Sequence, residues 1–475
     1  MELKQKAISG VKWVTVSTVV NNILQLILIS ILARFLSPAD FGLMALVNVV
    51  IEFSSYFIDA GFSNIIIHKQ DINRKQLSSI YWLSIATGIF IYLIIFVLSP
   101  LLSSFYGEKE LEPLLKLVAI TFLIIPFGQQ HKSLFQKELK FNTIATIEII
   151  SRSISFIVGV SAAINGFGVY SLALMVLSNS LASTILLFFR GIRNFKPSFS
   201  FSHVEIRNFY SFGLYQLGER TLNYFASQID TIIIGKLLGT NQLGIYTIAK
   251  NLIMKPAQII NPIVTKVAFP TMAKVQNNID SLKKIYLNTI RYLSSVNFPI
   301  YIGIAIMAEP LTVILFGNKW IGAIILIKVL AFFGMIRSVF NPIGSLLLAR
   351  GRADLGFFWN VYSSITSAII IFIGSFWGLL GISLAQSLAL IVLSIPFYFS
   401  LIKKMIRAEY WEYHSAIVIP LLISLVAGII PFILEYLING LIFKIITVGI
   451  SGIVIYYFLT LKYNRVFLSI IKSFR

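Results

Sequence analysis

Fourteen apolar stretches, each long enough to cross a lipid bilayer, constrain this chain of 475 residues more than any single motif. A hydrocarbon core takes roughly 20 apolar residues per helical crossing, and backbone amides inside it must be hydrogen-bonded within the protein. The stretches lie near residues 12–33, 41–67, 79–102, 114–130, 143–164, 167–189, 210–238, 243–270, 285–308, 321–349, 356–377, 379–401, 415–437 and 441–461. We therefore expect an all-α integral membrane protein with 14 transmembrane helices.

The placement of Lys and Arg predicts how these helices are oriented. The formal net charge of +20 would also suit a nucleic-acid-binding protein, but membrane proteins retain basic connections in the cytoplasm, so no nucleic-acid partner is expected. The odd-numbered connections carry four Lys or Arg residues, whereas the even-numbered connections and the two termini carry 25. Both termini are therefore predicted to be cytoplasmic, which requires an even number of crossings and agrees with 14.

Two negative features narrow the chemistry. The first apolar run follows Lys4, Lys6 and Lys12 as a signal peptide would, but it is too long for a signal core, and we interpret it as the first helix. The sequence contains 0 cysteines, which excludes a disulfide framework and thiolate metal or redox sites. We expect no catalytic residues, no metal and no cofactor.

A repeated turn indicates an internal duplication. ARFLSPADFG at 33–42 matches GKLLGTNQLG at 235–244, and a shift of 202 residues places Arg34 on Lys236 and Gly42 on Gly244. In both copies a cation ends one helix and turn formers follow, so a new helix is predicted after Asp40 and after Asn241. We interpret the turn as the outer corner of each half rather than as a binding loop.

Two later segments continue the match in order. PLLSSFYG at 100–107 aligns with PLTVILFG at 310–317, and GFGVYSLA at 166–173 aligns with GLLGISLA at 378–385. The sequence thus predicts two parallel six-helix repeats plus two C-terminal helices, with an N-lobe at 1–195, a C-lobe at 196–405 and the last two helices with the cytoplasmic C-terminus at 406–475. Such halves are typical of transporters that alternate access to a central site.

Polar residues at helical spacing predict which faces line that site, because polar groups in lipid turn toward the protein interior. The predicted seventh helix carries such a face, and the shift of 202 places Asn21 of the first helix on Asn223. The predicted substrate-binding residues are Arg220, Lys250, Lys255, Asn223, Asn21 and Gln25. The predicted coupling-ion residues are Glu52, Asp59 and Asp230. Pro256, directly after Lys255, suggests a locally opened backbone there.

Charges well inside the apolar runs favour cations, which suits an anionic cargo. We count eight basic residues, namely Lys116, Arg152, Arg220, Lys250, Lys255, Arg291, Lys328 and Arg337, against five acidic ones, namely Glu52, Asp59, Glu148, Glu219 and Asp230. Structural ion pairing is the alternative, and Glu148 and Arg152, four residues apart, suit it. Lys116 and Arg291 lie near helix ends and can extend to the interface.

These residues carry a family resemblance. The chain resembles Wzx-type polysaccharide flippases of the multidrug/oligosaccharidyl-lipid/polysaccharide exporter superfamily, in the branch near colanic acid and lipopolysaccharide exporters. The matching segments are GVKW at 10–13, ARFLSPADFG at 33–42, SQIDTIIIGKLLGTNQLGIYTIAK at 227–250, FPTMAKVQ at 269–276 and PLTVILFGNKW at 310–320. They span most of the first ten predicted helices, whereas the last two helices match only in being apolar.

The resemblance implies a bacterial inner-membrane protein that moves an undecaprenyl-pyrophosphate-linked oligosaccharide to the outer leaflet for surface polysaccharide assembly. It implies alternating access, proton or sodium coupling, and association with polysaccharide polymerase and chain-length machinery. Buried cations are what a pyrophosphate needs, because Arg clamps phosphate oxygens as a fork and Lys holds them as a point charge. On this hypothesis Arg220 and Lys250 engage the pyrophosphate.

Other classes of membrane protein predict features that differ from those of this sequence. A cation-coupled multidrug antiporter of the same superfamily would share the architecture but would favour a more acidic cavity. A membrane glycosyltransferase or polymerase predicts a DxD motif, and an ATP-driven pump predicts a GxxxxGK[ST] loop; the sequence contains neither. A scaffold without transport activity has no evident need for charges buried in lipid. The sequence therefore favours a flippase that is not an enzyme.

Overall fold

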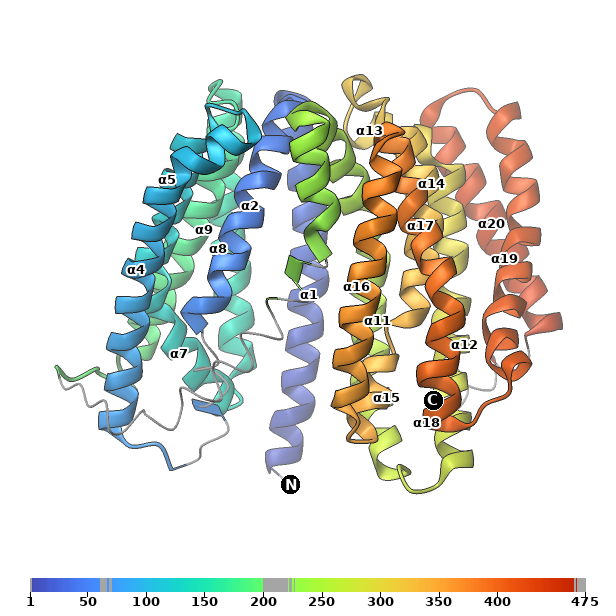
Figure 1. Cartoon of the computed structure of the whole chain (residues 1–475), viewed down its shortest axis with the longest axis horizontal. Helices are drawn as coiled ribbons and strands as arrows, with labels where there is room; N and C mark the ends of the chain where they lie inside the picture. Colours follow the sequence, from blue (N-terminus) through green and yellow to red (C-terminus); the bar gives the residue numbers. More distant parts are fainter. Residues whose placement is uncertain are drawn as a thin grey trace. The chain divides into compact units, whose positions relative to one another are not determined.

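The computed structural model describes residues 2–59, 66–67, 71–199, 221, 224–225, 227–464 and 467, without the side chains of 2–9, 11, 12, 15 and 59. Every element in this part of the chain is a helix. The chain divides into two compact units, Met1–Gly244 and Ile245–Arg475 (Figure 1).

Unit 1 is a set of long and short helices in which successive long helices alternate in direction (Figure 1). Its elements are α1 (Glu2–Phe35), α2 (Pro38–Asp59), α4 (Arg74–Tyr106), α5 (Leu111–Ala119), α6 (Thr121–Ile124), α7 (Pro126–Lys137), α8 (Phe141–Ile164), α9 (Tyr170–Gly191) and the first residues of α11 (Gly239–Lys274). Helix α8 packs between α1 and α9, while α4 packs on α5.

Unit 2 contains the rest of α11 and the helices that follow it. These are α12 (Ile279–Ile306), α13 (Ala308–Leu315), η1 (Asn318–Trp320), α14 (Ala323–Phe340), α15 (Ile343–Ala349), α16 (Ala353–Ser375), α17 (Gly378–Phe397), η2 (Tyr398–Ile402), α18 (Lys403–Ile406), α19 (Tyr410–Leu437) and α20 (Leu441–Tyr463). Helix α12 packs on both α14 and α19, and α17 packs on α14 and α16.

The predicted all-helical membrane architecture is confirmed at the level of element type. Among the described residues, ten helices are long and apolar enough to cross a membrane, or up to 12 if each of two bent pairs is one span. The predicted helices at 114–130 and 285–308 correspond to these pairs, which bend by 49° before Pro126 and by 74° between α12 and α13. The crossing at 210–238 lies partly outside the described residues, and the one at 243–270 falls in α11, which continues through Pro256.

The compact units differ in extent from the sequence-based lobes. The described residues from 227 to 244 group with unit 1, so the boundary falls inside α11 at Gly244, whereas the sequence places a lobe boundary at residue 195. The lobe division at 195 and 405 stays a prediction.

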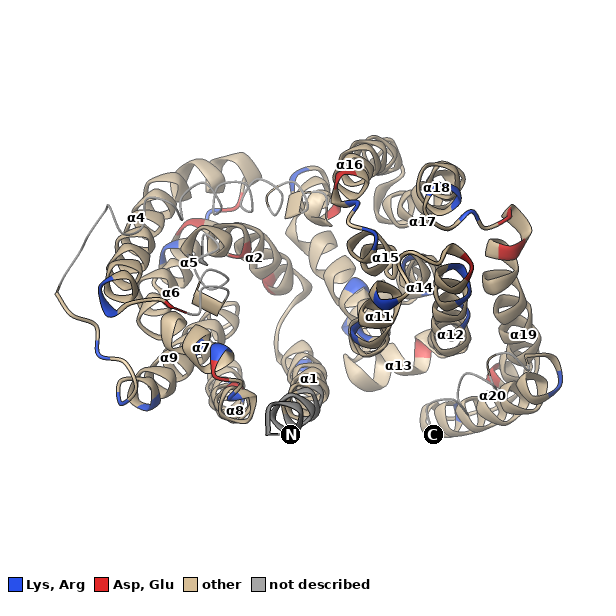
Figure 2. Cartoon of the chain, turned by 90° about the horizontal axis from the view of Figure 1, so that it is seen from below, with Lys and Arg blue, Asp and Glu red and all other residues tan. Residues whose placement is uncertain are grey.

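Charged residues occupy little of the helical ribbon. Seen from below, most of the helices are uncharged, and Lys and Arg lie in several of the connections between helices (Figure 2). This is the distribution expected when helix walls contact lipid and charged groups remain in water.

The repeated turn starts its second helix earlier than predicted. Helix α2 begins at Pro38 and α11 at Gly239, so Asp40 and Asn241 lie inside the first turn rather than before it. The physical reason at α2 is a reciprocal cap: the backbone N–H of Ser37 donates to Asp40 (2.7 Å), and that of Asp40 donates to the Ser37 hydroxyl (3.2 Å). Proline at the first helical position needs no such partner.

The starts of α2 and α11 contact each other through backbone atoms. A Cβ added to Gly42 would lie 1.8 Å from the carbonyl oxygen of Thr240, and one added to Gly244 would lie 1.7 Å from the carbonyl oxygen of Pro38. Each glycine therefore touches the residue that stands four positions before the other glycine. Glycine permits this approach because it has no side chain.

Prolines inside a helix, or in the turn between two successive helices, leave carbonyls without their usual donor, and side chains fill three of these positions. The carbonyl of Phe96, four residues before Pro100, accepts from the Ser99 hydroxyl (2.9 Å). The carbonyl of Ser295, four before Pro299, accepts from the Tyr456 hydroxyl (2.6 Å). The carbonyl of Ser338, four before Pro342, accepts from the Asn261 amide (3.0 Å). The last two bonds tie α20 to α12 and α11 to α14.

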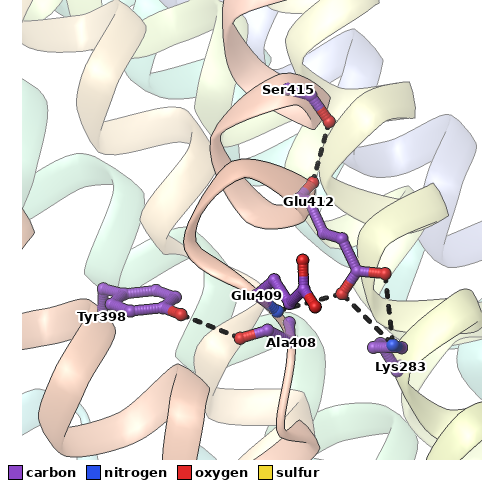
Figure 3. A network of polar contacts seen from close by, with 6 residues as sticks. All are labelled: Lys283, Tyr398, Ala408, Glu409, Glu412 and Ser415. Carbon is purple, nitrogen blue, oxygen red and sulfur yellow. Dashed lines mark hydrogen bonds and ion pairs between the residues drawn. The ribbon is translucent and has the colours of Figure 1, made fainter.

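A polar network fixes the start of α19 against α12 (Figure 3). The Lys283 ammonium donates to both oxygens of Glu412 at 3.1 and 3.2 Å, and the backbone N–H of Glu409 donates to the same carboxylate (2.9 Å). The Tyr398 hydroxyl donates to the carbonyl of Ala408 (2.8 Å), which positions the connection into α19. Polar contacts as well as apolar packing thus hold α19 and α20 against the other helices of unit 2.

Replacing either contact glycine with alanine should destabilise the protein. The added methyl cannot occupy a point less than 2 Å from a backbone oxygen, so the helices must separate, at a cost of about 1–3 kcal/mol. We expect Gly42→Ala and Gly244→Ala to lower the Tm of the purified protein in detergent.

Gly449→Ala is the matched control, because a Cβ there meets nothing within 4 Å. That change should leave the Tm equal or slightly higher, since alanine favours helix. An equal effect at all three positions would contradict the close contact.

Candidate functional site

The predicted site residues fall into three groups. Arg220 and Asn223 lie outside the described residues, as does the side chain of Asp59 at the end of α2. Unit 1 holds Asn21 and Gln25 on α1, Glu52 on α2, and Asp230. Unit 2 holds Lys250 and Lys255 on α11.

The structure brings Glu52 and Asp230 into one polar chain within unit 1. The Gln228 amide donates to the Glu52 carboxylate (3.4 Å), and the Thr231 hydroxyl lies 3.2 Å from the Gln228 side-chain oxygen. The same hydroxyl lies 3.4 Å from Asp230, whose carboxylate also accepts from the backbone N–H of Thr231 (2.8 Å). An exposed carboxylate and a 2% exposed one are thus linked by two neutral side chains.

Aromatic rings lie beside this series of polar side chains. The Tyr224 hydroxyl donates to the carbonyl of Val49 on α2 (2.8 Å), and its ring lies 5.6 Å from Tyr56 and 5.9 Å from Phe53. Sequence reasoning did not assign roles to Tyr224, Gln228 or Thr231. The signal was available, because Gln228 and Thr231 flank Asp230 in the SQIDT segment that carries the family resemblance.

On α1 two polar side chains bond to the backbone of their own helix, and one further side-chain atom is unsatisfied. The Thr18 hydroxyl donates to the carbonyl of Val14 (2.7 Å), and the Asn22 amide donates to the carbonyl of Thr18 (2.8 Å). The side-chain oxygen of Asn21 is buried and has no hydrogen-bond partner among the described residues. Gln25 is partly buried.

In unit 2 the predicted cations lie on α11, which also carries the buried side chain of Asn261. Lys250 is partly buried, with its ammonium 5.8 Å from the centre of the Tyr246 ring, and Lys255 is also partly buried. Further along α11, Asn261 is 4% exposed and its side-chain oxygen accepts from the Asn297 amide (3.2 Å).

The expected pair between Glu148 and Arg152 takes a different form. Glu148 accepts from the ammonium of Lys132 on α7 (2.9 Å), while Arg152 acts on Glu148 only as a nearby charge. Lys116 is paired with Glu112 (2.6 Å). Lys132 therefore pairs with Glu148, the carboxylate that spacing along α8 assigned to Arg152.

Chemically, the described residues place carboxylates in unit 1 and ammonium groups on α11 in unit 2. Within the described ranges no group of three His, Asp or Glu side chains is placed to hold a metal ion. The linked carboxylates of Glu52 and Asp230 can bind a proton or a monovalent cation, and the lysines of α11 can bind an anion.

Comparison with known families decides the identity of the chain. Residues 31–325 match the family described as "Polysaccharide biosynthesis protein". The chain belongs to this family. It is 32% identical over 441 residues to the lipopolysaccharide biosynthesis protein WzxC of Escherichia coli K12, covering 93% of this chain and 90% of WzxC. The predicted resemblance to Wzx-type proteins is thereby confirmed.

A second relative and one solved structure extend the comparison. The polysaccharide biosynthesis protein is 33% identical over 440 residues to the teichuronic acid biosynthesis protein TuaB of Bacillus subtilis 168, covering 90% of this chain and 89% of TuaB. Its fold matches the lipid II flippase MurJ in an inward closed conformation with a TM-score of 0.77 at 14% identity, covering 95% of this chain and 98% of MurJ. Its ten apolar helices, or up to 12 spans with the bent pairs of the described residues, make the polysaccharide biosynthesis protein a multi-pass membrane protein, as predicted.

Proposed function

We propose that this protein flips undecaprenyl-pyrophosphate-linked oligosaccharide repeat units from the cytoplasmic to the outer leaflet of a bacterial inner membrane, for O-antigen, capsule or exopolysaccharide synthesis. The observation that carries the proposal is the match to WzxC and TuaB along nearly the whole chain. The fold shared with MurJ supports it, because an architecture used by a lipid II flippase accommodates a lipid-linked cargo.

The proposed architecture is fourteen crossings arranged as two parallel six-helix repeats and two further helices. Ten spans and two bent pairs, together with the predicted crossings at 210–238 and 243–270, account for fourteen. The contact between Gly42 and Gly244 supports the repeat, because these glycines are equivalent under the shift of 202, and so are Pro38 and Thr240.

The proposed mechanism is alternating access between the lobes at 1–195 and 196–405. Arg220 and Lys250 engage the pyrophosphate, and Lys255, Asn223, Asn21 and Gln25 line the path of the head group. The two cations match a pyrophosphate, since a guanidinium donates to two phosphate oxygens and an ammonium neutralises a third.

The return step is coupled to a proton or a sodium ion at Glu52, Asp59 or Asp230. The chain from Glu52 through Gln228 and Thr231 to Asp230 supports this, because it joins a carboxylate that reaches solvent to a buried one. Such a link lets the charge state of one carboxylate influence the other, so that binding of a proton or a cation at either one is felt at both.

A multidrug antiporter is the alternative within the superfamily. The relatives' roles in polysaccharide synthesis and the surplus of cations in the apolar runs favour the flippase. Association with a polysaccharide polymerase and chain-length machinery is a further part of the proposal, which co-purification from the native membrane tests.

Neutralising both proposed phosphate ligands should abolish export. We expect Arg220→Gln combined with Lys250→Gln to fail to complement a flippase-null strain while membrane levels stay normal. Lys462→Gln, at the end of α20, is the control and should complement. Export retained by the double variant would remove these residues from the binding site.

Removing the charge of Asp230 should uncouple transport from the ion gradient. One charge moved through 100 mV is worth about 2.3 kcal/mol, so Asp230→Asn should lower the attainable cargo gradient by roughly 50-fold. The measurement is lipid-linked oligosaccharide flipping in vesicles with imposed proton or sodium gradients. Asp354→Asn, an exposed residue paired with Arg352, is the control. An unchanged gradient dependence in Asp230→Asn would contradict its role.

The proposed orientation can be tested with single cysteines, because the chain has none of its own. Lys109→Cys and Asn439→Cys lie in exposed connections predicted to face outward, and Asn277→Cys lies in one predicted to face the cytoplasm. A membrane-impermeant maleimide should label the first two in intact cells and the third only after permeabilisation. The reverse pattern would overturn the assignment of both termini to the cytoplasm.

A further inference from the structure

Arg152 occupies the middle of α8 and has no place in the mechanism above. The same helix exposes an apolar stripe to lipid, formed by Ile150, Ile154 and Ile157, which are 40%, 39% and 64% exposed. Arg152 lies two residues from both Ile150 and Ile154, about 160–200° around the helix. Its side chain is partly buried and therefore leaves α8 on the side that faces the interior of unit 1.

The charge of Arg152 is not neutralised locally. Its charged neighbour is Glu148, one turn earlier on α8. That carboxylate already accepts from Lys132 at 2.9 Å, so two cations share one anion. No residue in the described part of the chain forms a hydrogen bond or ion pair with the guanidinium. An excess positive charge inside a membrane protein requires an anionic partner.

The helix register places an unsatisfied amide opposite Arg152. Helices α1 and α8 pack together and run in the same direction (Figure 1), and a Cβ on Gly10 would lie 2.6 Å from the Phe141 ring. Asn21 lies 11 residues after Gly10 on α1, and Arg152 lies 11 residues after Phe141 on α8. Eleven residues are close to three full turns, so both side chains lie on the facing sides at equal depth.

The side-chain oxygen of Asn21 is buried without a partner among the described residues, although a guanidinium lies at the same depth. The two groups do not satisfy each other in this conformation. A ligand oxyanion would satisfy Arg152, and an adjacent hydroxyl would satisfy the Asn21 oxygen. If the amide is turned, its NH₂ group donates to the oxyanion instead.

We propose that Arg152 and Asn21 form a second oxyanion subsite inside unit 1, separate from the cations of α11. It rests on the proposed function, and it takes either a phosphate of the lipid carrier or a carboxylate of an acidic sugar. Lys132 and Glu148 are positioning residues: the Lys132 ammonium keeps Glu148 from closing on Arg152. The subsite supplies unit 1 with an anion-binding group of its own.

Export by charge variants tests the subsite against a purely structural role. Arg152→Gln should lower export in a complemented flippase-null strain by about tenfold or more, and Arg152→Lys should restore part of it, since charge returns without the fork. Lys116→Gln is the matched control, an intramembrane cation that already has a carboxylate partner.

A double variant separates binding from pairing. If Arg152 only balances Glu148, then Glu148→Gln combined with Arg152→Gln should restore export. We expect no restoration, because the ligand would still lack its cation. Full export in either Arg152→Gln or the double variant would overturn the subsite.

Direct binding is measured independently of transport. Purified wild type and Arg152→Gln in detergent are heated with sodium pyrophosphate, sodium glucuronate, or sodium chloride at equal ionic strength. If pyrophosphate stabilises wild type but not Arg152→Gln, and glucuronate stabilises neither, the subsite binds the carrier. If glucuronate stabilises wild type but not Arg152→Gln, and pyrophosphate stabilises neither, the subsite binds the glycan. If neither anion stabilises wild type, or both proteins respond equally, the subsite is refuted.

The two proposals fail in different ways. Failure of wild type to complement the null strain or to flip lipid-linked cargo in vesicles removes the proposed flippase function. Wild-type activity together with an indifferent Arg152→Gln variant removes only the subsite.

Discussion

The structure depends on one requirement, that every backbone carbonyl inside the bilayer find a donor within the protein. Helices meet it automatically except at prolines, and this chain places prolines in α4, α11, α12, α17 and α19. At Pro100 the donor is the adjacent serine, so the carbonyl is satisfied within α4 itself. At Pro299 and Pro342 the donor comes from another helix, and satisfying the carbonyl also joins two helices. The interruption of helical hydrogen bonding at these prolines thereby produces a contact between two helices.

The same requirement explains what could be read from the sequence. Apolar length predicts helices because lipid leaves few alternatives, and the helices from α8 to α9 and from α14 to α20 lie where the apolar runs lie. Bends are harder to predict, since Pro100 and Pro126 look alike in sequence but only Pro126 lies at a break of 49°. The difference arises from packing: the carbonyl of Phe122, four residues before Pro126, lies against Gly88 of α4.

Charge pairing shows the same limit for the site. Glu148 and Arg152 have the spacing of an ion pair, yet Lys132 from α7 takes the carboxylate. Spacing along one helix carries no information about a neighbour 16 residues away in sequence. The carboxylates at 52 and 230 were identifiable as polar residues in apolar runs, but their linkage through Gln228 and Thr231 depends on how α2 packs against the segment after residue 227. The polar residues of the site could be predicted from the sequence, but their hydrogen-bond and ion-pair partners could not.

The contact between the starts of α2 and α11 has a consequence for how such a protein diverges. The atoms nearest to each glycine are backbone atoms, so the residue that supplies the oxygen contributes nothing to this contact through its side chain. Pro38 and Thr240 stand at equivalent positions and share no side-chain chemistry, yet both serve. The contact does not tolerate a side chain in place of either glycine, but it accepts different residues at the positions that supply the carbonyl oxygens. A search for correlated substitutions would therefore miss it, because the partner of each glycine has no identity to preserve.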